Sequence, residues 1–272
     1  MSSGRDMGST RKLEIRSWFP FVLLVSTGLA VTMVLVIVVS QFLYTGPIKP
    51  LRAFLEKDVQ SAILLSLFTA SVAATIGLIL AIPSAYFLAR HRTWARSIID
   101  GVLDVPVILS PIALGTALLL FFRTQPGRWI ETHMIQFVFE VPGIILAQFF
   151  LAFALSVRVL KTSFESVDIR LEQVARFLGC SQWQAFSGVT LPMARGGLIA
   201  AFVLSWARAI GDFGASVTIA GAVKGKTETI PVSIYLNLAS VKIEKAVALM
   251  IMIVALAAIV LISIRILARK NR

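Results

Sequence analysis

Residues 158–192 read RVLKTSFESVDIRLEQVARFLGCSQWQAFSGVTLP, a polar stretch with a helical pattern that lies between two strongly apolar segments. Its apolar residues recur at intervals of four, three and four, at Val167, Leu171, Val174 and Leu178. This spacing puts them on one face of a helix, while the charged residues between them point elsewhere. The stretch therefore predicts an amphipathic helix outside the apolar segments.

This helix has a residue that favours a helix start at one end and a residue that favours a helix end at the other. Asp168 can accept hydrogen bonds from the free amides of the first turn, and Gly179 can adopt the left-handed backbone that ends many helices. Within the helix, Glu172 can pair with Arg176 one turn later. We therefore expect a short helix between residues 168 and 179.

A second short helix should follow without a long loop. Ser181 and Gln184, three residues apart, form a capping box, and Pro192 marks the point where the next segment takes a new direction. The two helices together predict a sharp corner that depends on the glycine at position 179.

Composition places this corner beside a membrane. Hydrophobic residues make up 57% of the 272 residues and charged residues 15%, and the mean hydropathy is +0.86. These values are too apolar for a soluble domain of this length. Because one span needs roughly 20 apolar residues, the chain has room for about six spans and no large soluble domain.

The apolar segments predict an all-α, polytopic membrane protein. We expect spans at about 18–44, 61–88, 141–157, 196–221 and 247–267 and a further span within 100–122, with polar loops at 45–60, 123–140 and 222–246. Pro106 and Pro111 predict a kinked or broken entry into the third span, because proline removes a backbone donor there.

The distribution of basic residues predicts the orientation of these spans. Most of the 26 Lys and Arg residues fall in segments 1–17, 90–104, 158–195 and 265–272. Under the positive-inside rule these segments, with both termini, are cytoplasmic. We therefore expect a cytoplasmic tail, 1–17, and a single transmembrane domain, 18–272, whose corner lies in a cytoplasmic loop at 158–195. The net charge of +12 then faces anionic lipid rather than nucleic acid.

Few residues suggest catalysis or metal binding. The single cysteine, Cys180, excludes an internal disulfide, and His91 and His133 are isolated, so we expect no metal site. Residues 221–227 have three residues between their glycines where a phosphate-binding loop needs four, so we expect no ATP on this chain. The spans contain one acid, Asp212, which argues against an intramembrane enzyme with paired carboxylates.

Arg208 and Asp212 are the charged residues inside the fifth predicted span. Four residues apart, they would lie one turn from each other on the same helix face. Charges within a membrane are costly, so they line a water-filled path or pair with a partner. Two interpretations remain open: a pathway or gate that handles an anion, and a self-neutralised pair that holds helices together. Gly211 and Gly214 would let another helix approach closely in either case.

The corner also contains a recognisable motif. Gln173-Val174-Ala175, then Gly179, then Val189-Thr190-Leu191-Pro192 resembles the EAA loop of permease subunits in ATP-binding-cassette importers. That pattern is Glu-Ala-Ala, three residues, Gly, nine residues, and Ile-x-Leu-Pro. The spacing agrees throughout, with Gln173 in place of the Glu, which leaves Glu172 as the neighbouring acid, and with Val174 and Val189 in place of Ala and Ile.

Two further stretches narrow the resemblance. Trp206-Ala-Arg-Ala-Ile-Gly-Asp-Phe-Gly-Ala215 and Thr229-Ile-Pro-Val-Ser-Ile-Tyr235 are similar to segments of molybdate, tungstate and sulfate permeases. The resemblance covers about residues 60–267. It implies a type I importer permease in the plasma membrane of a prokaryotic-type cell, for a tetrahedral oxyanion, with molybdate or tungstate as the expected substrate.

The resemblance also implies partners and site residues. It implies a homodimer, two cytoplasmic ATPase subunits that bind ATP and Mg, an extracytoplasmic solute-binding protein, and no cofactor on this chain. The implied ATPase-coupling residues are Glu172, Gln173, Val174, Ala175, Leu178, Gly179, Cys180, Ser181 and Trp183. The candidate pathway or gate residues, from the charges and glycines of the fifth predicted span, are Arg208, Gly211, Asp212 and Gly214.

Other assignments stay open from the sequence. The substrate can instead be sulfate or another solute of the same importer class, or the chain can be a secondary transporter or channel. The corner helix could also lie on the membrane surface. Basic residues at the expected outer mouth either steer an anion or are ordinary loop charges, and these are Lys49, Arg52, Lys57, Lys224, Lys226, Lys242 and Lys245.

Overall fold

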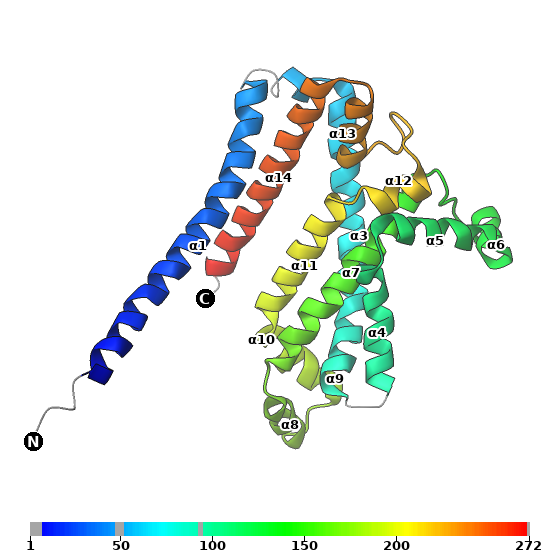
Figure 1. Ribbon diagram of the computed structural model, residues 1–272. Helices are drawn as coiled ribbons and strands as arrows, with labels where there is room; N and C mark the ends of the chain where they lie inside the picture. Colours follow the sequence, from blue (N-terminus) through cyan, green and yellow to red (C-terminus); the bar gives the residue numbers. More distant parts are fainter. Residues whose placement is uncertain (1–6, 47–51, 92–94, 271–272) are drawn as a thin grey trace, which may run out of the picture.

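The computed structural model describes residues 7–46, 52–91 and 95–270, and every long element in these ranges is an α-helix (Figure 1). The helices are α1 (Met7–Thr45), α3 (Lys57–Arg90), α4 (Ala95–Ile108), α5 (Pro111–Arg123), α6 (Gln125–His133), α7 (Val141–Glu165), α8 (Ile169–Phe177), α9 (Gln182–Ala185), the π-helical turn η1 (Phe186–Thr190), α10 (Leu191–Met193), α11 (Arg195–Ile210), α12 (Gly214–Ala220), α13 (Ile230–Ala239) and α14 (Ile243–Lys270). The predicted all-α class is confirmed. Part of the predicted tail, residues 1–6, lies outside the described ranges.

By length and composition the described residues contain four to six candidate spans, against about six predicted. Helices α1, α3, α7 and α14 are long and apolar enough to cross a membrane. Two bent pairs bring the number to as many as six: α4 with α5, at 107°, and the α9–α10 segment with α11, at 71°.

The third span is broken near its start, so the predicted kinked or broken entry at Pro106 and Pro111 is confirmed. The break falls at Leu109 and Ser110, directly before Pro111. Ser110 is extended, with ψ 146°, because a residue before proline avoids the helical region. Its hydroxyl accepts a hydrogen bond from the amide of Ala113 at 3.2 Å and so caps α5.

The predicted fifth span, 196–221, is wrong as a continuous helix. Helix α11 ends at Ile210 and α12 begins at Gly214. Two predicted loops are also wrong in part, because α6 lies within 123–140 and α13 within 222–246. The fourth span runs on to Glu165, beyond its predicted end at residue 157.

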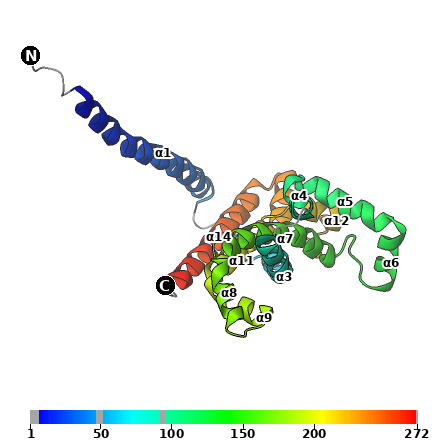
Figure 2. The same ribbon diagram turned by 90° about the horizontal axis from the view of Figure 1, so that it is seen from below.

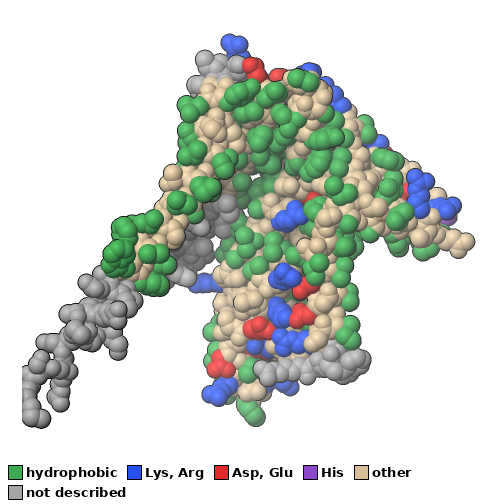
Figure 3. Space-filling model, in the orientation of Figure 1, with side chains coloured by type: hydrophobic (Ala, Val, Ile, Leu, Met, Phe, Trp, Pro, Cys, Tyr) green, Lys and Arg blue, Asp and Glu red, His purple; other side chains and the backbone are tan. Residues whose placement is uncertain are grey.

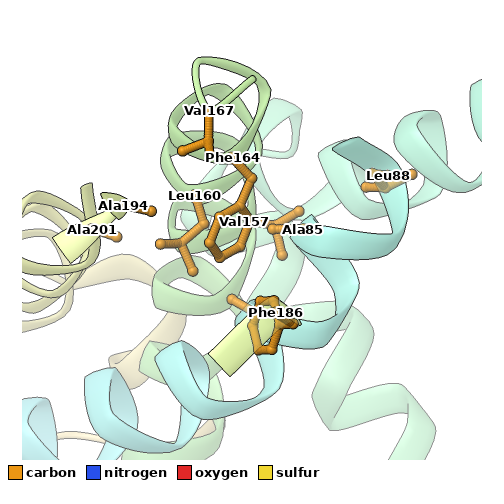
Figure 4. Close-up of a cluster of buried hydrophobic side chains, with 10 residues drawn as sticks. Ala85, Leu88, Val157, Leu160, Phe164, Val167, Phe186, Ala194 and Ala201 are labelled. Carbon is orange, nitrogen blue, oxygen red and sulfur yellow. The ribbon is translucent and has the colours of Figure 1, made fainter. Parts of the chain in front are cut away.

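Helix α7 lies at the centre of the bundle and packs on α3, α4, α11 and α12. Small residues on α3, such as Ala81 and Ala85, are fully buried and allow the helices to approach closely. Near the end of the bundle that carries α8, larger side chains, including Leu88, Leu160, Phe164 and Phe186, form a buried cluster (Figure 4). This cluster supports the corner from the inside.

Helix α1 leaves this bundle and packs on α14 (Figures 1 and 2). The most apolar window within Trp18–Gln41 contains no buried residue. A helix that is apolar all round and exposed in this way is suited to lipid or to another apolar protein surface.

Candidate functional site

The corner, which comprises α8, α9, η1 and α10, has the predicted helix ends. Asp168 accepts a hydrogen bond from the amide of Arg170 at 2.9 Å, and Gly179 has φ +95°. The capping box is complete: the Ser181 amide donates to Oε1 of Gln184 at 2.7 Å, and the Gln184 amide donates to Oγ of Ser181 at 3.2 Å. The sequence thus predicted the geometry of this turn correctly.

The outer side of the corner carries an exposed apolar surface, which we call the apolar tip. Its members are Val174, Phe177, Leu178 and Trp183. Phe177 is 91%, Leu178 81% and Trp183 72% exposed, and they cluster on a polar corner outside the apolar segments, where an exposed apolar patch marks a site for a partner. Phe177 was missed by the sequence analysis, although an aromatic residue beside a helix-ending glycine on a polar helix was a usable signal.

The other predicted coupling residues divide between the surface and the interior. Gln173, Gly179, Cys180 and Ser181 are exposed beside the apolar tip, and Ala175 is half-buried. Glu172 is buried, with 7% of its surface exposed. The structure therefore places one member of the predicted coupling set inside the protein.

Glu172 binds α3 and η1 rather than Arg176, so the predicted pairing within α8 is wrong. Its carboxylate accepts hydrogen bonds from the Tyr86 hydroxyl at 2.8 Å, from Nε of Arg90 at 2.8 Å and from the Thr190 hydroxyl. These four residues form what we call the Glu172 cluster. No sequence signal identified it, because Glu172 is 82 residues from Arg90.

Electrostatics keep Glu172 ionised in this setting. Burial alone would raise the pKa of the carboxyl, but hydrogen bonds from Thr190, Tyr86 and Arg90 outweigh burial and hold the pKa of Glu172 below its usual value. The pair with Arg90 is closed to solvent on both sides, with side-chain exposures of 8% and 9%.

The predicted pathway residues lie at the break between α11 and α12. Arg208 is half-buried in the last turn of α11, and Asp212 is buried two residues beyond its end. Oδ2 of Asp212 accepts from the amide and the hydroxyl of Ser216 at 2.9 and 2.7 Å. Within the described ranges Oδ1 of Asp212 has no hydrogen-bond partner, and Arg208 forms no ion pair with it. The predicted one-turn pair on a single helix is therefore wrong.

The two predicted glycines differ in their surroundings. A Cβ on Gly214 would meet Pro111 at 3.0 Å and Ile112 at 3.1 Å, so α12 approaches the start of α5 closely, as the glycine predicted. Gly211 is exposed and caps α11. The break between α11 and α12 therefore lies beside the break between α4 and α5.

Three of the seven basic residues of the expected outer mouth are paired with acids. Lys224 contacts Asp58 at 2.7 Å, Lys226 pairs with Glu140, and Lys245 pairs with Glu56. Such pairs favour the interpretation of ordinary loop charges over steering. Lys49 lies outside the described residues.

Comparison with known proteins agrees with this geometry. The chain is 38% identical over 178 residues to the molybdenum transport system permease protein ModB of Haemophilus influenzae, covering 64% of this chain and 78% of that protein. It is 30% identical over 223 residues to the sulfate transport system permease protein CysW of Synechocystis, covering 81% of each.

A solved structure has the same fold. It is a bacterial alginate ABC transporter in complex with an alginate pentasaccharide-bound periplasmic protein, with a TM-score of 0.75 at 16% identity over 96% of this chain and 97% of that one. Residues 73–272 also match the family model described as a binding-protein-dependent transport system inner membrane component. With the corner, the broken spans and these relatives taken together, the chain belongs to this family of inner membrane permeases of ABC importers.

Proposed function

We propose that this chain, paired with a second copy of itself, forms the pathway of an ATP-driven importer for a tetrahedral oxyanion, with molybdate or tungstate as the substrate. The observation that carries the proposal is the apolar tip on a rigidly capped corner. Loose loops cannot transmit a displacement, whereas a short capped helix can move as a rigid body.

The apolar tip has the chemistry of a docking surface for a cytoplasmic ATPase. Aromatic and aliphatic side chains held on a short helix can enter a groove and bury most of their surface. The exposed face of Gln173 beside the apolar tip would add polar contacts at the rim. ATP and Mg then bind to the partner and not to this chain, and the corner lies on the cytoplasmic side with both termini.

The substrate side of the proposal rests on the break between α11 and α12. Arg208 carries a positive charge that is half-exposed on a single copy of the chain, so a second copy would be needed to complete a closed pathway around it. An arginine in such a place can offer a passing dianion several N–H donors. A solute-binding protein would deliver the anion at the opposite face.

Sulfate is the second candidate, because the sulfate permease CysW is also among the relatives. Both anions are tetrahedral and doubly charged, so the same residues would suit either. The identity to the molybdenum permease is higher, at 38% against 30%, which favours molybdate.

Uptake in cells tests the proposal. The chain is expressed with its ATPase and binding protein in bacteria that lack their own molybdate importer, and labelled molybdate uptake is measured with and without competing tungstate or sulfate. We expect ATP-dependent uptake that tungstate suppresses and sulfate suppresses weakly. Strong sulfate competition would favour the second candidate, and uptake driven by an ion gradient without the ATPase would contradict the proposal.

A further inference from the structure

The carboxylate of Glu172 joins three separate elements of the chain. It belongs to α8, its donors Tyr86 and Arg90 belong to the last turns of α3, and its donor Thr190 belongs to η1. We infer that Glu172 is a positioning residue that fixes α8 to α3 and η1, so that a displacement of the apolar tip moves the spans. The inference rests on the proposed function and assigns Glu172 no contact with the ATPase.

The two donors on α3 bind the carboxylate of Glu172 together. Tyr86 and Arg90 are four residues apart, so they lie on the same face of α3 and reach the carboxylate together. Arg90 also donates to the carbonyl of Val167 at 3.0 Å, in the link between α7 and α8. The end of α3 therefore holds both α8 and the segment that leads into it.

The donor on η1 connects α8 to the segment that leads into α11. Thr190 is fully buried and its hydroxyl contacts Oε1 of Glu172. It closes a π-helical turn, a rare form that recurs at functional sites. Beyond η1 and α10 the chain enters α11, which carries Arg208, so one carboxylate links the corner to the helix of the proposed pathway.

Glu172 faces away from the apolar tip. At about 100° per residue, Val174 and Phe177 lie roughly 200° and 140° around α8 from Glu172. Both are exposed while Glu172 is buried. An ATPase that covers the apolar tip would therefore contact a different face of α8 from the one that carries the carboxylate.

Aromatic packing stabilises the same contact between α3, α7 and η1. The Tyr86 ring lies 4.5 Å from that of Phe186 between centroids, and Phe186 lies 6.0 Å from Phe164 of α7. The side chains of Phe164 and Phe186 belong to the buried cluster at this end of the bundle (Figure 4). Polar and apolar contacts thus hold α3, α7 and η1 as one unit at the base of the corner.

Glu172→Gln tests the inference in the purified complex with its ATPase and binding protein, reconstituted in lipid vesicles. We expect normal co-purification of the ATPase, because the apolar tip is unchanged. We expect the number of molybdate ions imported per ATP hydrolysed to fall about tenfold, the effect of weakening one buried charge-assisted contact. Loss of ATPase binding would instead make Glu172 a contact to the partner and overturn the inference.

If Glu172→Gln does not fold, two matched variants at Thr190 test the same inference. Thr190→Val removes the hydroxyl donor and keeps the volume, whereas Thr190→Ser keeps the donor. We expect Thr190→Val to lower the transport-to-ATP ratio and Thr190→Ser to preserve it, with equal thermal stability of the two complexes. Equal ratios for the pair would overturn the inference. A wild-type complex without ATP-driven uptake would instead refute the proposed function, independently of either variant.

Discussion

Single residues in this chain separate into those that hold the structure and those that face a partner. Glu172 and Asp212 are both buried acids, but their surroundings differ. Glu172 accepts hydrogen bonds from donors on two neighbouring elements. Asp212 accepts hydrogen bonds only from the nearby Ser216, and its second carboxylate oxygen is unpaired in the described part of the chain. The first arrangement is rigid. The second leaves Asp212 able to accept a further donor when the helices move.

The lowered pKa of Glu172 predicts how acid affects the corner. Because the folded pKa lies below the usual value of about 4.3, the stabilisation is fully present above that value and is lost as the pH falls through the folded pKa. The protection factors of residues 169–185, which compare each exchange rate with the intrinsic rate at the same pH, should therefore fall below about pH 4 in detergent. Glu172→Gln should remove this fall, and α13 serves as an internal reference; wild-type protection factors that do not change with pH would contradict the prediction.

Arg208→Ala is expected to lower molybdate uptake by about tenfold while assembly stays intact, because the variant removes a charge from the proposed pathway and no ion pair from the described structure. Uptake in vesicles and co-purification of the ATPase measure the two effects. Arg123→Ala, at an exposed arginine of α5, is the control and should transport normally. Normal transport by Arg208→Ala would leave Arg208 with a structural role.

Elements of the corner could be predicted from the sequence because their causes are local. The caps at Asp168 and Ser181 and the left-handed Gly179 depend on neighbours within a few residues. Pro106 and Pro111 also predicted the broken third span. The break between α11 and α12 and the partners of Glu172 could not be predicted. They depend on contacts between segments far apart in sequence, such as Gly214 against Pro111, and apolar composition alone does not distinguish a broken span from a straight one.

Gly179→Ala should destabilise the corner by roughly 1–2 kcal/mol, because φ +95° is unfavourable for a residue with a Cβ even where space is open. Gly188→Ala is the matched control, since Gly188 also has open space but no positive φ. Thermal unfolding of the two variants measures the difference. Equal melting temperatures would contradict the assignment of strain to Gly179.

Leu178→Glu should release the ATPase, because a charge would have to enter an apolar groove at a cost of more than 1 kcal/mol. Val223→Glu changes an exposed valine outside the corner and should leave the complex intact. Co-purification of the tagged chain with its ATPase gives the readout. Undiminished recovery with Leu178→Glu would remove the apolar tip from the docking surface.

At the scale of the whole molecule, charges gather at the end that bears the corner, at the opposite end of the bundle and at the right-hand tip of the view, and exposed apolar side chains cover much of the surface between them (Figure 3). Near the corner, Arg96 pairs with Glu165 at 2.6 Å, and Arg158 with Asp104 at 2.7 Å. Both pairs join α4 to α7, so the first half of a broken span is fastened to the central helix. Because these ion pairs join the helices, a displacement at the corner can move the helices as far as the break at Gly211 and Asp212.

The central claim places the corner on the cytoplasmic side, covered by an ATPase, and labelling of Cys180 tests it most directly. Cys180 is the single cysteine of the chain and is exposed beside the apolar tip, so any thiol label reports this site, with Cys180→Ser as the control. A membrane-impermeant maleimide should leave intact spheroplasts unlabelled, label inside-out vesicles stripped of the ATPase, and label them poorly once the ATPase is restored. Labelling from outside the intact spheroplast would contradict the account.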